Sequence, residues 1–270
     1  MAKLVYIGGY GRSGSTLLEY LLTAQRKVVA CGEIGRHTRR FAKHKTCTCG
    51  RPMQDCPIWG SFQHDSGKLK GWSHERLTLA LLDHVAKDYA VMVDSSKTAW
   101  TSLLTPFRLR RALGENFLLV HLVRDPRGVA WSMMRWKPKK ARQYLPPGAR
   151  GLRAAVGWFA ANLACEAFGR RHPENYLALR YEDLSRDPRQ AVSEIERRLG
   201  LPPVDLERGQ EIDNRHQLYG NAMRFKELKP MELKEDVAWK TAMPAVWRSL
   251  VGWMTWPLRG RYRYGRIERP

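Results

Sequence analysis

The first residues of this chain that could do chemistry lie close to its start, in the run YIGGYGRSGSTLLEYLL. Four residues separate Gly9 from Gly14, and a stretch of helical character begins at Ser15. A glycine-rich turn between a strand and a helix offers several backbone N–H groups to one anion, and the helix N-terminus adds a favourable dipole. The spacing therefore predicts a loop that binds phosphate or a similar group.

The positive charge of this loop stands in an unusual place. A nucleotide triphosphatase has lysine where this chain has Ser15, and that lysine reaches the β and γ phosphates. Here the cation is Arg12, three residues earlier, at the crest of the loop. At that position it could contact a bridging or leaving oxygen, while Ser13 and Thr16 add hydroxyl donors. The loop predicts an anion site that is not that of an ordinary triphosphatase.

Strands and helices are expected to alternate along the chain. The apolar patterns predict strands at 3–8, 89–93, 117–123 and 176–181, and helices at 15–24, 73–87, 101–113, from 126, at 150–170 and at 188–199. This order favours a three-layer α/β fold with a mostly parallel central sheet and helices on both faces. Ligands bind beyond the carboxyl ends of such strands. The loops after Ile7, Val93 and Val123 fall at that edge.

The composition supports a folded globule that attracts anions. Hydrophobic residues make up 43% of the 270 residues, and the formal net charge is +21. We expect one domain over residues 1–270, with an irregular insertion or lid at 36–72 and a Trp/Arg-rich segment at 239–270. No secretory leader or apolar run near the ~20 residues of a membrane span is visible. With five cysteines, an odd number, we expect a reduced, cytoplasmic protein.

Two segments of the chain resemble motifs of a known enzyme family. GYGRSGSTLLEYLL resembles the phosphosulfate-binding loop of sulfotransferases that use 3′-phosphoadenosine 5′-phosphosulfate (PAPS). LVRDPRGVAWSM resembles their 3′-phosphate motif, with Arg124 at the end of a strand and Ser132 eight residues later. LRYEDLSRDP, YGNAMRF and the pair CGE and CTCGRPMQDCPIW also recur in the family. The resemblance runs in the same order from residue 4 to about 226.

The resemblance implies transfer of a sulfuryl group from PAPS to a hydroxyl or amine, leaving adenosine 3′,5′-bisphosphate (PAP) and needing no metal. Arg124 and Ser132 would hold the 3′-phosphate, Tyr181 would lie near the adenine, and Arg224 would close over the nucleotide. The acceptor is not identified; a glycan, a lipid, a small metabolite or a peptide tyrosine all fit. The phosphosulfate contacts implied are Gly11, Arg12, Ser13, Gly14, Ser15, Thr16 and Leu17.

The chemistry of this transfer needs a base for the acceptor proton and cations for the leaving phosphate oxygen. Arg12 is the expected cation, with Lys97 of DSSK as its partner. Glu33 of CGEIGR is the expected base because it resembles the glutamate of family members with Cys-Gly-Glu after the first helix. Some relatives place the base one residue later, where this chain has Ile34. Asp94 and His37 are rival bases.

Other functions compete with this interpretation. A P-loop nucleotide kinase would need lysine at position 15 and a metal-binding carboxylate, for which Asp94 alone is poor support. A basic nucleic-acid-binding protein would explain the charge, but no RNA- or DNA-binding motif accompanies it, so no nucleic-acid partner is expected. The basic tail from Trp239 packs against the core or contacts an acidic or membrane-surface partner.

One cluster of soft ligands stands apart from these motifs. His44, Cys47, Cys49 and Cys56 lie within the run HKTCTCGRPMQDC. They could bind zinc, although Cys-x-Cys followed by a third Cys at this distance is not a usual finger spacing. A disulfide and plain buried thiols are the alternatives, and buried thiols are favoured.

Overall fold

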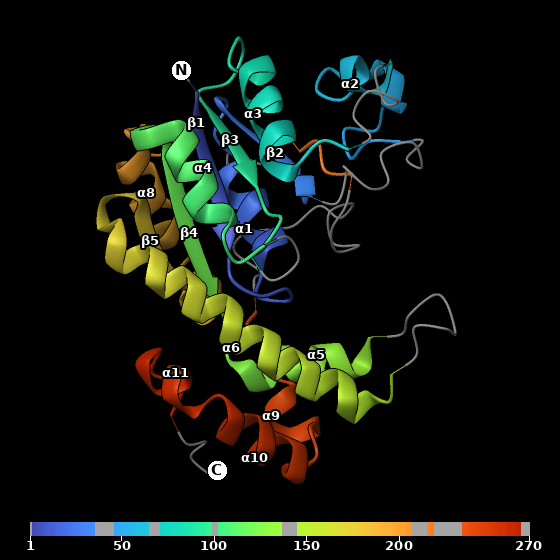
Figure 1. Ribbon diagram of the computed structural model, residues 1–270, viewed down its shortest axis with the longest axis vertical. Coiled ribbons are helices and arrows are strands. Elements are labelled where there is room, and N and C mark those ends of the chain that lie inside the picture. Colours follow the sequence, from blue (N-terminus) through green and yellow to red (C-terminus); the bar gives the residue numbers. More distant parts are fainter. Residues whose placement is uncertain are drawn as a thin grey trace.

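The computed structural model describes residues 2–35, 46–64, 71–98, 102–136, 145–206, 215–218 and 234–265. Within these ranges one five-stranded sheet has the order β2-β3-β1-β4-β5, and every neighbouring pair is parallel (Figure 1). The strands are β1 (Lys3–Gly8), β2 (Val28–Gly32), β3 (Val91–Asp94), β4 (Phe117–Val123) and β5 (Tyr176–Arg180).

Helices cover both faces of this sheet, which confirms the predicted three-layer α/β fold. One face packs on α3 (His74–Val85), α4 (Thr105–Leu113) and α6 (Pro147–Arg171), and the other on α1 (Ser15–Leu22), α7 (Tyr181–Arg186) and α8 (Pro188–Leu199). Successive strand residues face opposite layers. Tyr6 therefore enters the first core and Val5 the second. Burial on both faces explains why the strands read as continuous apolar runs.

The helix starts follow local capping signals. Ser73, Asp125 and Asp187 each accept a hydrogen bond from a backbone N–H in the first turn of α3, α5 (Pro126–Arg135) and α8, respectively. Proline occupies the first position of α5 and α8, where its missing N–H costs nothing. α8 ends at Leu199, and its C-cap Gly200 has a φ of 69°, which suits glycine. These boundaries agree with the sequence analysis.

The edge strand β2 was not predicted. It lies where the sequence analysis placed no strand between residues 8 and 89, and it pairs with β3. Its short run VVACG follows α1 closely, and only pairing with β3 makes it a strand. The insertion contains η3 (Met53–Asp55) and α2 (Gly60–His64), and η4 (Gly114–Asn116) and η6 (Pro173–Asn175) precede β4 and β5.

The C-terminal segment forms α9 (Trp239–Ala242), α10 (Ala245–Met254) and α11 (Trp256–Arg261). Figure 1 shows them, in red, along α5 and α6 beyond the end of the sheet. Packing against the core therefore accounts for part of this segment, and its contact with an acidic or membrane-surface partner stays a prediction. Among the described residues, no helix has the length and apolar character needed to cross a membrane.

Candidate active site

The sheet order brings the predicted loops together at one edge. β1 lies between β3 and β4, with Tyr6 opposite Asp94 and Gly8 opposite His121. β2 adjoins β3, so Gly32 pairs with Asp94. Because parallel strands end at the same edge, the loops that follow β1, β2, β3 and β4 meet there.

The loop after β1 depends on glycine at two close approaches. Gly9 has a φ of 101°, and a Cβ there would lie 2.6 Å from the backbone oxygen of Leu122. Gly14 has a φ of 90° and caps α1, and a Cβ there would lie 2.6 Å from Cδ2 of Tyr181. Any larger residue would therefore displace β4 or the Tyr181 ring.

Two of the predicted cationic residues have a strained backbone conformation. Arg12 and Lys97 have φ values of 70° and 60°, in the left-handed region that costs a non-glycine residue about 1–2 kcal/mol. Such strain gathers at functional sites, where the surrounding structure holds it in place. The predicted catalytic residues are thus set in their positions by the fold.

Ser13 of this loop has a buried hydroxyl whose hydrogen-bonding capacity is unused among the described residues. Its hydroxyl oxygen is buried and has no hydrogen-bond partner within the described part of the chain. A buried hydroxyl without a partner is costly. The backbone N–H groups at the start of α1 lie next to it in sequence, so the loop fits an anionic oxygen.

Arg12 lies between the two other predicted anion-binding residues, Ser132 and Arg124. Arg12 Nε donates to Ser132 Oγ at 2.9 Å, and Arg124 Nη1 donates to the backbone oxygen of Arg12 at 3.1 Å. Burial and the neighbouring charge of Arg124 lower the pKa of Arg12, while Glu33 raises it. The loop after β1 and the segment after β4 therefore bring two arginines together at one site.

Arg124 also contacts a residue that the sequence analysis missed. Its Nη2 donates to Oδ2 of Asp236 at 2.9 Å and to the backbone oxygen of Asp236 at 3.1 Å. The guanidinium lies over the Tyr181 ring, 4.5 Å from its centroid, and the Tyr181 hydroxyl accepts from the Asp236 N–H. Tyr181 thus lies beside Arg124, and its place near the adenine stays a prediction. Nothing in the run KEDVAW points to Asp236.

Glu33 and Lys97 form the polar centre of the site. Lys97 Nζ donates to Glu33 Oε1 at 2.6 Å and to the backbone oxygen of Ser95 at 2.9 Å. Both side chains are buried. They come from the ends of β2 and β3, so the missed strand β2 is what brings the predicted base to the predicted cation.

The rival bases are differently placed. Asp94 Oδ1 accepts from the backbone N–H and the hydroxyl of Ser96, and Asp94 Oδ2 pairs with His74 Nε2 at 2.7 Å. Both of its oxygens are engaged, which favours a positioning role. Ile34 is fully buried in the apolar core. His37 and the predicted nucleotide contact Arg224 lie outside the described residues.

A second buried carboxylic acid lies behind this site on α1. Glu19 Oε1 accepts from the Gly32 N–H at 3.1 Å, and its Oε2 accepts from Gln217 Nε2 at 2.7 Å. Burial raises the pKa of Glu19 to about 8, although Lys97 acts to lower it. Glu19 therefore links α1 to the segment 215–218 and to Gly32 of β2, the residue before Glu33.

Comparison with known proteins gives the family. The model of the sulfotransferase family matches residues 5–205. Among solved structures, the chain is similar to a sulfotransferase domain of the Synechococcus PCC 7002 olefin synthase, with TM-score 0.63, 18% identity, and coverage of 98% of this chain and 96% of that one. No curated protein sequence matches the chain significantly.

Two further solved structures share the fold. A sulfotransferase domain from the curacin biosynthetic pathway has TM-score 0.61 and 21% identity, and covers 93% of this chain and 96% of its own. A sulfotransferase from Mycobacterium avium has TM-score 0.56 and 11% identity, and covers 99% of this chain and 78% of its own.

The chain belongs to the sulfotransferase family. Family membership and the shared fold identify it as a sulfotransferase enzyme, which confirms the prediction from sequence. Membership also supports PAPS as the co-substrate.

Proposed function

We propose that this enzyme binds PAPS across the loop after β1 and the end of β4, and transfers the sulfuryl group to an acceptor hydroxyl or amine in line with the breaking bond. The convergence of Arg12, Ser132 and Arg124 carries the proposal. PAPS is anionic at both ends of its adenosine, so it needs two anion sites joined by one surface. Arginine suits both, because its planar fork matches phosphate oxygens.

The residues of the loop hold the phosphosulfate end. The backbone N–H groups between Gly11 and Leu17, with the Ser13 hydroxyl, face the anionic oxygens. Arg124 and Ser132 hold the 3′-phosphate, and Tyr181 supports Arg124 by stacking beneath it. Arg224 would add its charge from the YGNAMRF motif.

The transfer step is assigned to three residues. Glu33 accepts the acceptor proton while the acceptor oxygen or nitrogen forms a bond to sulfur. The bond between sulfur and the 5′-phosphate oxygen breaks, and Arg12 and Lys97 stabilise the negative charge that grows on that oxygen. Arg12 and Lys97 supply the positive charge that this step needs, so no metal ion is assigned to it. Added Mg²⁺ should therefore leave the rate unchanged.

Differential stabilisation by nucleotides tests the proposal. PAP at ~100 times its Kd should add about 2.7 kcal/mol to the free energy of unfolding, seen as a raised Tm. ATP with Mg²⁺ should not, since a kinase would need the lysine that position 15 lacks. Arg124→Ala should abolish the PAP shift. Arg197→Ala, an exposed arginine of α8 paired with Glu194, is the matched control and should keep it.

Two results would contradict the proposal. A larger shift with ATP and Mg²⁺ than with PAP would favour the kinase hypothesis. A PAP shift that survives Arg124→Ala would remove the proposed 3′-phosphate site. If PAP binds as expected, release of PAP from PAPS in the presence of phenolic, sugar, lipid or peptide acceptors then identifies the acceptor class.

A further inference from the structure

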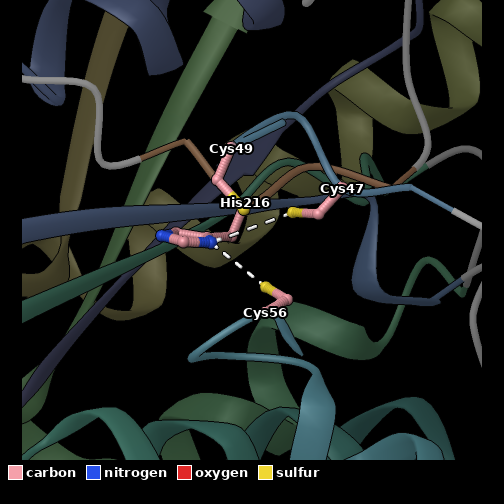
Figure 2. Close-up of side chains that lie close together, drawn as sticks. All are labelled: Cys47, Cys49, Cys56 and His216. Carbon is pink, nitrogen blue, oxygen red and sulfur yellow. Dashed lines mark hydrogen bonds between the residues drawn. The ribbon is translucent and has the colours of Figure 1, made fainter. Parts of the chain in front are cut away.

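Four side chains outside the active site meet in a cluster that the sulfuryl transfer does not use. Cys47, Cys49, Cys56 and His216 present three sulfur atoms and one ring nitrogen, all within 4.8 Å of one another. We call these four residues the Cys-His cluster. Figure 2 shows the sulfur atoms gathered at the Nδ1 side of the His216 ring.

The distances in the cluster match those of a metal site. His216 Nδ1 lies 3.8 Å from Cys47 Sγ and 3.3 Å from Cys56 Sγ. In a tetrahedral zinc site, bonds of ~2.3 Å to sulfur and ~2.1 Å to nitrogen place those two atoms about 3.6 Å apart. The observed separations bracket that value. All five cysteines are free thiols.

The first two ligands come from a tight turn. Thr46 and Pro52 form an antiparallel bridge, Cys47 N–H donates to the backbone oxygen of Arg51, and Gly50 N–H donates to that of Cys47. Gly50 has a φ of 80°, which glycine adopts without strain. This geometry holds Cys47 and Cys49 on one side of the turn before any ion is bound.

The other two ligands are equally well anchored. Cys56 ends η3, and its backbone oxygen accepts from the Gly60 N–H. His216 donates its backbone N–H to Ala30 of β2 at 2.7 Å, and its backbone oxygen accepts from Trp59 Nε1 at 2.5 Å. With both backbone groups engaged, the His216 ring has a defined direction, and that direction is toward the sulfurs.

Hydrogen bonds also join the turn to the segment 215–218, which carries the histidine. Thr48 Oγ1 donates to the backbone oxygen of Arg215 at 2.7 Å and accepts from the Gln217 N–H at 2.8 Å. Cys47, Cys56 and His216 are only 1%, 2% and 5% exposed, while Cys49 is partly exposed. The cluster is therefore shielded, with an open side at Cys49 through which an ion could enter.

We propose that Cys47, Cys49, Cys56 and His216 bind one structural Zn²⁺. Three thiolates and one imidazole form a soft, four-ligand set that suits zinc and leaves no open position for a substrate or water. The sequence analysis expected no metal and considered only His44 as the nitrogen ligand, because nothing in the sequence connects residue 216 with the cysteines. Zinc binding releases the thiol protons and adds to the free energy of folding.

The position of the cluster indicates what the zinc would do. It joins the turn at 46–52, η3 and the segment 215–218, and that segment is bridged to β2 through Ala30 and Arg215. Glu33 follows β2 directly. Zinc would thus fix the insertion beside the edge strand that carries the proposed base, without touching the reacting atoms.

Metal content of the full chain tests the proposal. Protein purified without an affinity tag that binds metals should contain one equivalent of zinc per chain by mass spectrometry. Cys56→Ser and His216→Ala should each lose most of it. Cys165→Ser, a buried cysteine of α6 outside the cluster, is the matched control and should retain the full equivalent.

A second measurement does not depend on variants that fold. Wild-type protein stripped of zinc and titrated with Co²⁺ should show the visible absorption of tetrahedral cobalt with thiolate charge-transfer bands, saturating at one equivalent. Stripping should also lower Tm, and added Zn²⁺ should restore it. Wild-type protein without stoichiometric zinc and without this cobalt spectrum would overturn the proposal. So would a Cys47–Cys56 disulfide found by mass, or iron with sulfide in place of zinc.

Discussion

Lys97 and Glu33 form a buried ion pair, with Nζ 2.6 Å from Oε1, although 64 residues separate them in the chain. The pair joins the ends of β3 and β2, two neighbouring strands. The backbone of Lys97 is in the left-handed region. Removing one partner of a buried pair leaves the other charge uncompensated. The two residues should therefore behave as one unit.

This coupling can be measured by denaturation. Lys97→Met and Glu33→Gln should each lower the free energy of unfolding by about 3 kcal/mol. The double variant should lose less than the sum, with a coupling of about 1–3 kcal/mol. The exposed Arg197–Glu194 pair, at 2.7 Å, is the control and should couple by under ~1 kcal/mol. Additive losses at Lys97 and Glu33 would contradict a shared role.

Glu33 should affect rate far more than nucleotide binding. Glu33→Gln keeps the shape of the side chain but removes the base, so kcat should fall by ~10²–10⁴. The Kd for PAP should stay within a small factor of wild type, because no proposed phosphate contact changes. Asp94→Asn should instead lower stability, since both Asp94 oxygens are engaged. An unchanged kcat in Glu33→Gln would reassign the base.

The left-handed backbone of Arg12 allows two variants to lose the same activity but differ in stability. Arg12→Ala and Arg12→Gly both remove the guanidinium, and both should lower the transfer rate by ~10²–10³. Glycine tolerates the φ of 70° while alanine does not, so the glycine variant should be more stable by about 1 kcal/mol. Urea denaturation of the two variants gives the comparison. Equal stability would mean that the variants relax out of the left-handed region.

Asp236 pairs with Arg124, the arginine that the proposed function assigns to the 3′-phosphate. Its carboxylate pairs with Arg124 Nη2 but is 53% exposed, so the pair adds little stability in water. In the proposed complex, the 3′-phosphate takes the place of this carboxylate on Arg124. Asp236→Asn should therefore tighten PAP binding several-fold by calorimetry, whereas the neighbouring Glu235→Gln should change it little. Weaker binding in Asp236→Asn would show that the carboxylate helps to orient Arg124 in the complex.

Glu19 should make stability depend on pH. Its folded-state pKa of about 8 exceeds the ordinary value of 4.5, so the protonated form is favoured in the folded protein. Its contribution to stability is complete below about pH 4.5 and is lost as pH rises through about 8. Glu19→Gln imitates the protonated form and should flatten this dependence. Urea midpoints across that range, with Asp83→Asn of α3 as the exposed control, measure the difference; an unchanged slope would contradict the raised pKa.

Local signals were sufficient to predict most of the elements and the loop after β1. Continuous apolar runs gave β1 and β4, Asp-Pro pairs gave the starts of α5 and α8, and the glycines gave the loop after β1. Each of these depends on the geometry of a few adjacent residues, which the residue types alone determine. Arg12 could be named for the same reason, whereas Arg124 and Ser132 were named from the resemblance to the sulfotransferase family.

The remaining contacts join residues far apart in the chain, and sequence spacing carries no signal for them. β2 is a strand only because β3 lies beside it, and that pairing brings Glu33 to Lys97. Asp236 reaches Arg124 across 112 residues, and His216 reaches Cys56 across 160. The strand order β2-β3-β1-β4-β5 brings these groups together, because it places segments that are distant in the sequence beside one another. Helices packed on both faces of the sheet bury the strands and so hold this order in place.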